Sequence, residues 1–156
     1  MGLDMYLSAS KSEHNYKFMG TADSPDNEKF VSIVNALNAQ DFVDTDSPFL
    51  TVDINVAYWR KANAIHGWFV ENVQNGQDDC GRYRVGRETL LRLQEACIQA
   101  LADRESNVLN PTEGFFFGSS EKDSYWEDDL RHTVTTIGTL LKIVPDDWSF
   151  YYQSSW

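Results

Sequence analysis

The spacing of apolar residues alternates along the chain between the two periods that strands and helices impose. Near the N-terminus, Leu3, Met5 and Leu7 alternate with more polar residues, which is typical of a half-buried strand. Residues 87–102, by contrast, carry apolar side chains three or four positions apart, which is typical of an amphipathic helix. Because segments of both kinds follow one another, the sequence predicts an α+β fold, with helices layered on a sheet.

The same patterns locate the individual elements. Helices are predicted at about residues 25–40, with Ser24 as N-cap and Pro25 in the first turn, and at 59–73, 87–102 and 124–143. Strands are predicted at residues 3–9, 50–57 and 115–117, around 83–85 and in the last ten residues, with a loop or hairpin return at 11–23. We expect about four helices on a small, mainly antiparallel or mixed sheet, in a single domain that covers residues 1–156.

Charge and hydropathy exclude several classes of partner. With 13 basic and 24 acidic residues, the chain has a formal net charge of −11. Such a surface repels nucleic-acid phosphates and anionic lipids unless the basic residues are segregated, so we expect no direct nucleic-acid partner. No stretch approaches the roughly 18 apolar residues that span a bilayer, so we expect no membrane partner.

Residues 58–70, YWRKANAIHGWFV, hold the densest group of aromatic and polar side chains. On the predicted helix, Asn63 and His66 lie within about 40° of Trp59, beside the apolar stripe, and Arg60 lies about 100° further round. An indole can stack on a planar ring, and a guanidinium can bind a carboxylate or phosphate, so this edge is a predicted ligand site. The alternative is that these are boundary residues whose polar atoms meet backbone or water.

A second candidate segment is PTEGFFFGSS, residues 111–120. Strand alternation sends Phe115 and Phe117 to one face of the sheet and Phe116 to the other. Glu113 lies near the start of the segment, where its carboxylate could accept a hydrogen bond from a ligand. We therefore add Glu113 and Phe116 to the predicted ligand site, with ordinary core filling as the alternative.

Cysteine and metal chemistry are both disfavoured. Cys80 follows two aspartates, and neighbouring acids raise the pKa of a thiol, which is the wrong direction for a nucleophile. Cys97 lies on the apolar side of its predicted helix, where a small core residue is expected. The three histidines and two cysteines show none of the short paired spacings that hold zinc. We expect no catalytic residue, no metal and no cofactor.

Several motifs together resemble a family of small, largely uncharacterised bacteriophage and prophage proteins. These motifs are GLDMYL, YWRKANAIHGWFV, DDCG, PTEGFFFGS and FYYQSSW, and they span nearly the whole chain. The resemblance brings no activity or functional residue with it. It implies a phage accessory protein that acts in the cytoplasm of a bacterial host.

These observations lead to one main hypothesis and two alternatives. The main hypothesis is a non-catalytic phage protein that binds a small, anionic, planar ligand resembling a nucleotide and so sequesters a signal of host defence. The first alternative is an acidic inhibitor that imitates nucleic acid or docks on a host protein. The second is an enzyme of unrecognised type, with His66, Glu113 and Asp79 in one cleft. Exposed aromatic residues in the tail that ends at Trp156 leave a homo-oligomer open.

Overall fold

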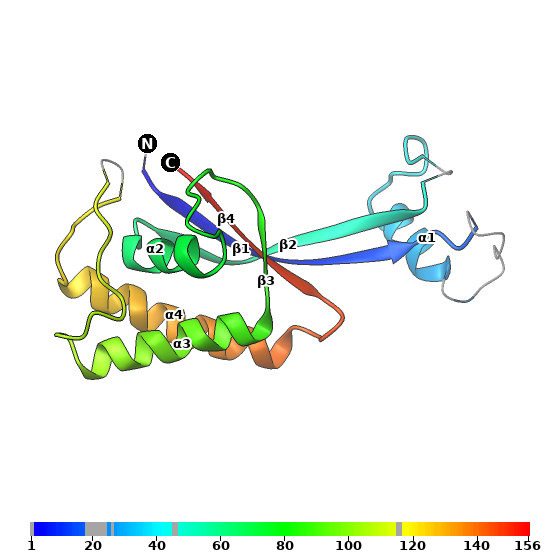
Figure 1. Cartoon of the computed structure of the whole chain (residues 1–156). Coiled ribbons are helices and arrows are strands. Elements are labelled where there is room, and N and C mark those ends of the chain that lie inside the picture. The colour runs from blue at the N-terminus through cyan, green and yellow to red at the C-terminus, as the bar shows by residue number, and fades with distance from the viewer. Residues whose placement is uncertain (1, 18–24, 26, 45–46, 115–116) are drawn as a thin grey trace. The chain divides into compact units, whose positions relative to one another are not determined.

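The computed structural model describes residues 2–17, 25, 27–44, 47–114 and 117–156. Within these residues it has the predicted α+β architecture, with four helices and a four-stranded antiparallel sheet (Figure 1). The strands are β1 (Asp4–His14), β2 (Phe49–Arg60), β3 (Tyr83–Val85) and β4 (Ser149–Ser155). The helices are α1 (Asn27–Ala36), α2 (Asn63–Asn72), α3 (Arg87–Ala102) and α4 (Ser124–Ile143). No helix among them is long and apolar enough to cross a membrane.

The chain divides into two compact units, a larger one of residues 1–9 and 54–156 and a smaller one of residues 10–53. The smaller unit has a hydrophobic cluster of its own, in which Phe30 and Val34 of α1 pack with Ala39. The larger unit contains α2, α3, α4 and most of the buried residues. Folding as one domain stays a prediction.

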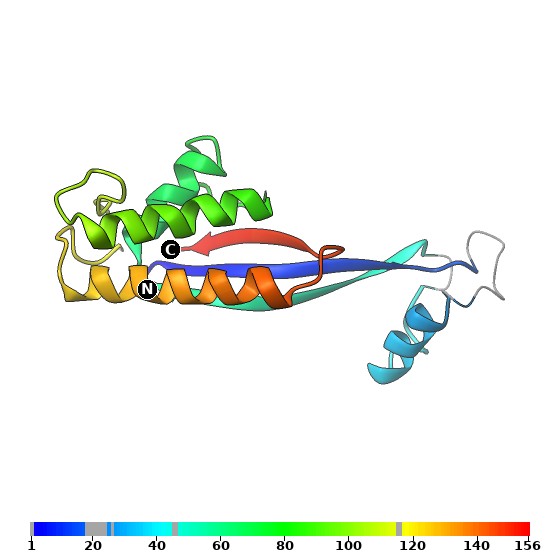
Figure 2. The same cartoon turned by 90° about the horizontal axis from the view of Figure 1, so that it is seen from below.

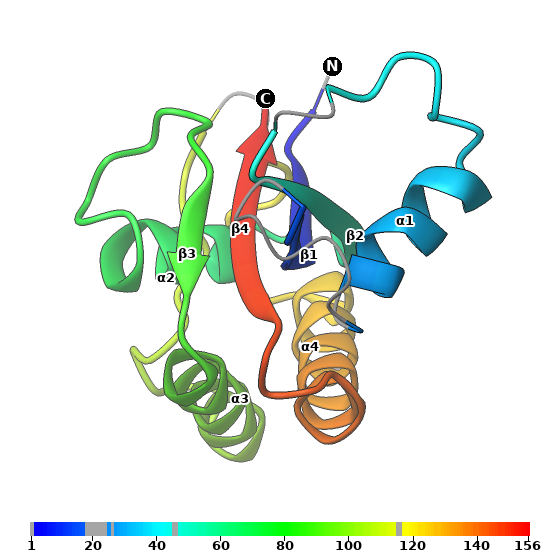
Figure 3. The same cartoon turned by 90° about the vertical axis from the view of Figure 1, so that its right-hand side faces the viewer.

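The strand order in the sheet is β2-β1-β4-β3. At one edge, the register of β3 and β4 sets Tyr83 opposite Tyr152 and Val85 opposite Phe150. Helices α3 and α4 lie beneath one face of the sheet (Figure 3). The side chains of β1 and β4 that face these helices are buried, and they are Leu3, Met5, Leu7, Ala9, Phe150 and Tyr152. Alternation along the strands therefore leaves the other face of the sheet without helical cover in the larger unit.

Helices α3 and α4 run side by side (Figure 2), as the apolar spacing of both segments predicts. A small residue permits their close approach: a Cβ atom at Gly138 would lie 2.6 Å from Nε2 of Gln94. The Gln94 amide instead donates a hydrogen bond to the backbone carbonyl of Val134, 2.9 Å away. The predicted bounds of both helices, 87–102 and 124–143, are confirmed.

Other predicted elements need correction. Strand β1 continues to His14, into the segment predicted as a loop or hairpin return, because Ser12 and Asn15 reach polar partners on and before β2. The alternation over 50–57 predicted Ile54 inside, yet this side chain is 48% exposed. Phe117 lies in a bend and not in a strand, and its backbone N–H donates a hydrogen bond to the carbonyl of Gly114. Phe115 lies outside the described residues. The predicted N-cap, Ser24, also lies outside the described residues.

Candidate functional site

The segment that the sequence presents as one long helix is a strand end followed by a shorter helix. Trp59 and Arg60 are the last residues of β2, and α2 begins at Asn63. The amide of Lys61 donates to the carbonyl of Leu3 at 2.8 Å, so pairing with the N-terminal strand extends past the end of β2. Lys61 then adopts a left-handed conformation with φ of 59°, and the chain turns into the helix. The predicted helix start at residue 59 was wrong because sheet pairing overrides the local apolar spacing.

This strand geometry separates the two neighbouring site candidates. Trp59 points into the core, where only 2% of it is exposed and its indole N–H donates to Oγ1 of Thr133 at 2.9 Å. Arg60 is exposed. Of the two, only Arg60 is therefore placed where it can meet a ligand from solution.

Asn63 holds the loop that precedes α4. Its amide nitrogen donates to the carbonyls of Phe117 at 3.0 Å and Ser119 at 2.7 Å, and its amide oxygen accepts the backbone N–H of Thr112 at 3.3 Å. Both amide hydrogens are thus committed to the fold, and the side chain is 5% exposed. Asn63 shapes the site by fixing this loop.

His66 is completely buried and bonded at both ring nitrogens. Nδ1 lies 2.7 Å from the hydroxyl of Tyr152, and Nε2 lies 3.0 Å from a carboxylate oxygen of Asp78. Burial, reinforced by the charge of Asp78, raises the pKa of Tyr152 well above its usual range. Because a carboxylate oxygen only accepts, Nε2 donates to Asp78, and in that tautomer Nδ1 accepts the hydrogen bond of the Tyr152 hydroxyl.

The same aspartate also accepts the indole N–H of Trp156 at 3.1 Å. Tyr152, His66, Asp78 and Trp156 therefore form a chain of hydrogen bonds that joins α2, the loop after it and the C-terminal strand. His66 has no ring nitrogen left for a ligand, so the function proposed below gives it no ligand role.

The remaining predicted residues have other surroundings or lie outside the described part of the chain. Glu113 is exposed in the loop before α4, and Phe116 lies outside the described residues. Asp79 accepts the amide of Gly81 and the hydroxyl of Tyr83, and these hydrogen bonds lower its pKa. No hydrogen bond or ion pair among the described residues joins Asp79 or Glu113 to His66.

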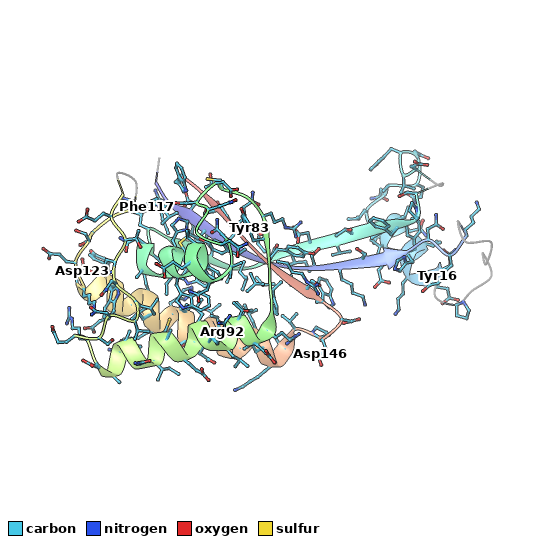
Figure 4. The ribbon with its side chains drawn as sticks, viewed as in Figure 1. Tyr16, Tyr83, Arg92, Phe117, Asp123 and Asp146 are labelled. Atoms are coloured by element: carbon cyan, nitrogen blue, oxygen red, sulfur yellow. The ribbon has the colours of Figure 1, made fainter. Side chains whose placement is uncertain are left out.

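A pocket of the larger unit lies between the start of α2 and the first turns of α4. Its volume is about 530 Å³, within the range of small-molecule sites. We call it the α2–α4 pocket, and its lining residues are Arg60, Lys61, Ala62, Asn63, Ala64, Ile65, Gly118, Ser119, Glu121, Asp123, Tyr125, Trp126, Asp129 and Leu130. Residues 118–123 form the loop that leads from Phe117 into α4. Phe117 and Asp123, at the two ends of this loop, are labelled in Figure 4. Of the predicted site residues, the structure brings Arg60 and Asn63 to this pocket.

One side of the pocket favours negative charge. Arg60 and Lys61 lead into it, and Ala64 and Ile65 line it from the first turn of α2, where backbone N–H groups have no preceding turn to bond. The N-cap residue, Ala62, offers no side-chain cap to these donors. Two cations and an uncapped helix start together suit an anionic group.

The other side carries carboxylates and an aromatic ring. Asp123 already accepts the backbone N–H of Trp126 at 3.0 Å, so it caps α4. Asp129 is different: it is half-buried, and burial, with smaller contributions from Asp128 and Asp123, raises its pKa from 3.8 to about 6. Tyr125 is 77% exposed at the pocket wall. This side can accept hydrogen bonds and cover a planar ring.

The sequence interpretation missed Asp129 and Tyr125, which line the pocket from α4. A signal for Asp129 does exist, since it lies between Trp126 and Leu130, both buried on the core side of the helix. An acid on the flank of an apolar stripe is held partly out of water, and that favours a role at a site.

Metal and thiol chemistry find no further support in the geometry. Among the described residues, no group of three or more His, Cys, Asp or Glu side chains could hold a metal ion. Cys97 is fully buried on α3, as predicted, and burial raises the pKa of its thiol to about 12. A protonated thiol in the core is a packing residue.

Comparison with known proteins adds no relative from which a function could be transferred. The resemblance to phage proteins therefore stays a prediction that rests on the motifs. No protein-family model, no curated protein and no solved structure matches the chain.

Proposed function

We propose that the chain is a non-catalytic binding protein that holds a small, anionic, planar ligand of the nucleotide class in the α2–α4 pocket. The observation that carries this proposal is the pairing of two unlike sides in one pocket of nucleotide size. One side offers donors for a phosphate, and the other offers an exposed ring and a half-buried carboxylate.

The phosphate is assigned to the side formed by Arg60, Lys61 and the start of α2. Guanidinium groups bind phosphate oxygens through two parallel hydrogen bonds, and helix N-termini favour anions through their free N–H groups. Lys61 reaches this position only because its left-handed backbone turns the chain from β2 into α2. A charge-assisted hydrogen bond of this kind is worth about 1.5–3 kcal/mol.

The base and sugar are assigned to the α4 side. The ring of Tyr125 is available for stacking, which stabilises bases by about 1–3 kcal/mol. The carboxylate of Asp129 has no hydrogen bond or ion pair among the described residues, and its partial burial disfavours the ionised form. A ligand N–H or O–H that bonds Asp129 relieves this penalty, so the pocket favours ligands with donors on the base or the sugar.

Sequestration is the mode of action that agrees with binding alone. No hydrogen bond or ion pair among the described residues joins His66 to Glu113 or Asp79, and both ring nitrogens of His66 are bonded to other residues. In the context that the phage resemblance implies, the bound molecule would be a nucleotide signal of host defence. A protein that holds such a signal tightly lowers its free concentration and needs no chemistry.

Nucleotide screening by thermal unfolding tests the proposal directly. The panel contains the four ribonucleoside monophosphates and the 3′,5′-cyclic and cyclic dinucleotide forms, with inorganic phosphate alone for comparison. A ligand at 100 times its Kd stabilises the folded state by about 2.7 kcal/mol. For 156 residues, that corresponds to a rise in Tm of about 5–10 °C.

Variants identify the site of binding. Arg60→Gln and Tyr125→Ala should each lower the affinity for the bound nucleotide at least tenfold. Lys142→Gln is the matched control, because Lys142 lies in the last turn of α4, away from the pocket lining, and should leave the affinity unchanged. The proposal fails if no nucleotide raises Tm, or if Arg60→Gln binds as well as the natural chain.

The alternative of an acidic, protein-directed inhibitor stays a prediction. It requires acids that gather on one exposed face, as in a nucleic-acid mimic. In the first turns of α4, however, Glu127 is bridged to Arg104 at 2.9 Å and to Arg131 at 3.4 Å. Cations between the acids weaken the resemblance to a phosphate backbone.

A further inference from the structure

The face of the sheet that α3 and α4 leave uncovered carries aromatic and arginine side chains in the larger unit. Tyr6 on β1 and Tyr58 on β2 are in contact, with ring centroids 5.4 Å apart and planes tilted by 42°. Tyr58 is 47% exposed, and its neighbour Trp59 points the opposite way, into the core. The ring pair therefore lies on the open side of these two strands.

A second planar group lies on the next strands of the same face. The guanidinium of Arg82 sits 4.2 Å above the ring of Tyr151 and donates to Oγ of Ser8 at 3.3 Å. Ser8 follows Tyr6 by two residues on β1, so strand alternation puts both on one face. Tyr151 alternates in the same way with the buried Phe150 and Tyr152. The planar groups thus extend across β2, β1 and β4.

The charge on this surface differs from that of the chain as a whole. Arg84, which pairs with Tyr151 in the register of β3 and β4, is exposed beside Arg82. Asp4 is the carboxylate that contacts the ring pair, and it accepts a hydrogen bond from the hydroxyl of Tyr58. The net charge of −11 argues against phosphate binding only while basic residues are dispersed, and here two exposed arginines adjoin the half-buried ring of Tyr151.

From this arrangement we infer that the open face of the sheet, formed by Tyr6, Tyr58, Tyr151, Arg82 and Arg84, binds single-stranded nucleic acid. Bases stack on tyrosine rings and guanidinium planes, and the guanidinium of Arg84, at the edge of the sheet, bonds phosphates. Four neighbouring strands about 4.8 Å apart span roughly 15 Å, which is the length of two to four nucleotides. A duplex is excluded as the occupant because its base faces are already stacked.

The charge balance sets the expected strength of this binding. The face has few basic side chains, so binding is weak at physiological salt and strengthens as the salt concentration falls. Stacking supplies the rest and is tolerant of sequence, because every base has a π-face. This inference does not depend on the α2–α4 pocket, which uses different side chains.

Fluorescence anisotropy with 5′-labelled eight-nucleotide oligomers, dT8 and rU8, tests the inference on the whole chain. We expect saturable binding at 50 mM salt that weakens at 200 mM, and no comparable binding of an eight-base-pair duplex. Tyr58→Ala, Tyr151→Ala and Arg84→Gln should each weaken binding at least about fivefold. Circular dichroism and thermal unfolding confirm that each variant is folded.

Two matched controls separate this surface from general electrostatics and from the pocket. Arg92→Gln removes an exposed arginine on α3, labelled in Figure 4, and should leave oligomer binding unchanged. Tyr125→Ala should weaken mononucleotide binding in the pocket without affecting the oligomers. The inference is overturned by the absence of oligomer binding at 50 mM salt, by equal binding of the duplex, or by an Arg92→Gln effect equal to that of Arg84→Gln. A dimer that Tyr58→Ala dissociates, without oligomer binding, would assign the face to a second copy instead.

Discussion

Replacing Asp129 by asparagine should stabilise the free protein, and by an amount that depends on pH. In the folded chain the carboxyl has a pKa of about 6, raised from 3.8, because partial burial disfavours its charge. A raised acid pKa means that the folded state binds the proton more tightly than the unfolded state. Stability is therefore lost as the pH rises from about 3.8 through about 6, and the loss is complete above that range.

The size of the effect follows from the difference between the two pKa values. About two pH units correspond to at most about 3 kcal/mol, and solvent screening of a half-exposed group lowers this to about 1–2 kcal/mol. Asp129→Asn removes the charge and keeps the shape, so it should raise the free energy of unfolding by that amount at pH 8. At pH 4, close to the unfolded-state value of 3.8, the two proteins should differ by no more than about 0.5 kcal/mol.

Urea unfolding of both proteins at pH 4 and pH 8, followed by tryptophan fluorescence, measures this difference. Glu95→Gln is the control, because it neutralises an exposed acid on α3 and should change stability by less than about 0.5 kcal/mol at either pH. If Asp129→Asn lowers stability at pH 8, or shifts it equally at both pH values, the burial argument for this carboxylate is refuted.

Three further substitutions test the contacts that build the site. His66→Leu leaves a buried tyrosine hydroxyl and a carboxylate without their partner, and should cost about 2–4 kcal/mol in urea unfolding; a loss below about 1 kcal/mol would contradict the bonded chain. Asn63→Ala should speed hydrogen exchange of the Thr112 amide at least tenfold, whereas unchanged exchange would mean that the loop holds without it. Trp59→Phe should cost about 1–3 kcal/mol through the lost indole hydrogen bond and volume, and Tyr58→Phe, on the exposed face, should cost far less.

The parts of the fold that local patterns control were predictable from the sequence. Both α3 and α4 begin and end where their apolar spacing begins and ends, and in α4 the cap is local as well, since Asp123 bonds the amide three residues on. The end of β2 was not predictable in this way. Trp59 and Arg60 fit a helical or an extended pattern equally well, and the hydrogen bond from Lys61 to Leu3, which joins distant parts of the sequence, favours the strand.

The candidate site shows the same division between local and distant information. The aromatic segment 58–70 supplies Arg60 and Asn63 to the pocket, as predicted, but the facing wall comes from α4, more than fifty residues later. His66 looked available because its partners, Asp78 and Tyr152, are 12 and 86 residues away in the sequence. Spacing within one segment shows which side chains share a face, and not which of them the fold has already satisfied.

The hydrogen bonds of Asn63 have a consequence for reading variation among related sequences. One short amide satisfies two carbonyls and one N–H of a loop about fifty residues away, and neither aspartate nor glutamine can reproduce that set at the same reach. We therefore expect residue 63 to be nearly invariant even in homologues that have lost or exchanged the ligand. Positions 60, 61, 125 and 129 should instead vary together when the ligand changes. Invariance at residue 63 therefore reports on loop architecture, and covariation at those four positions reports on what the pocket binds.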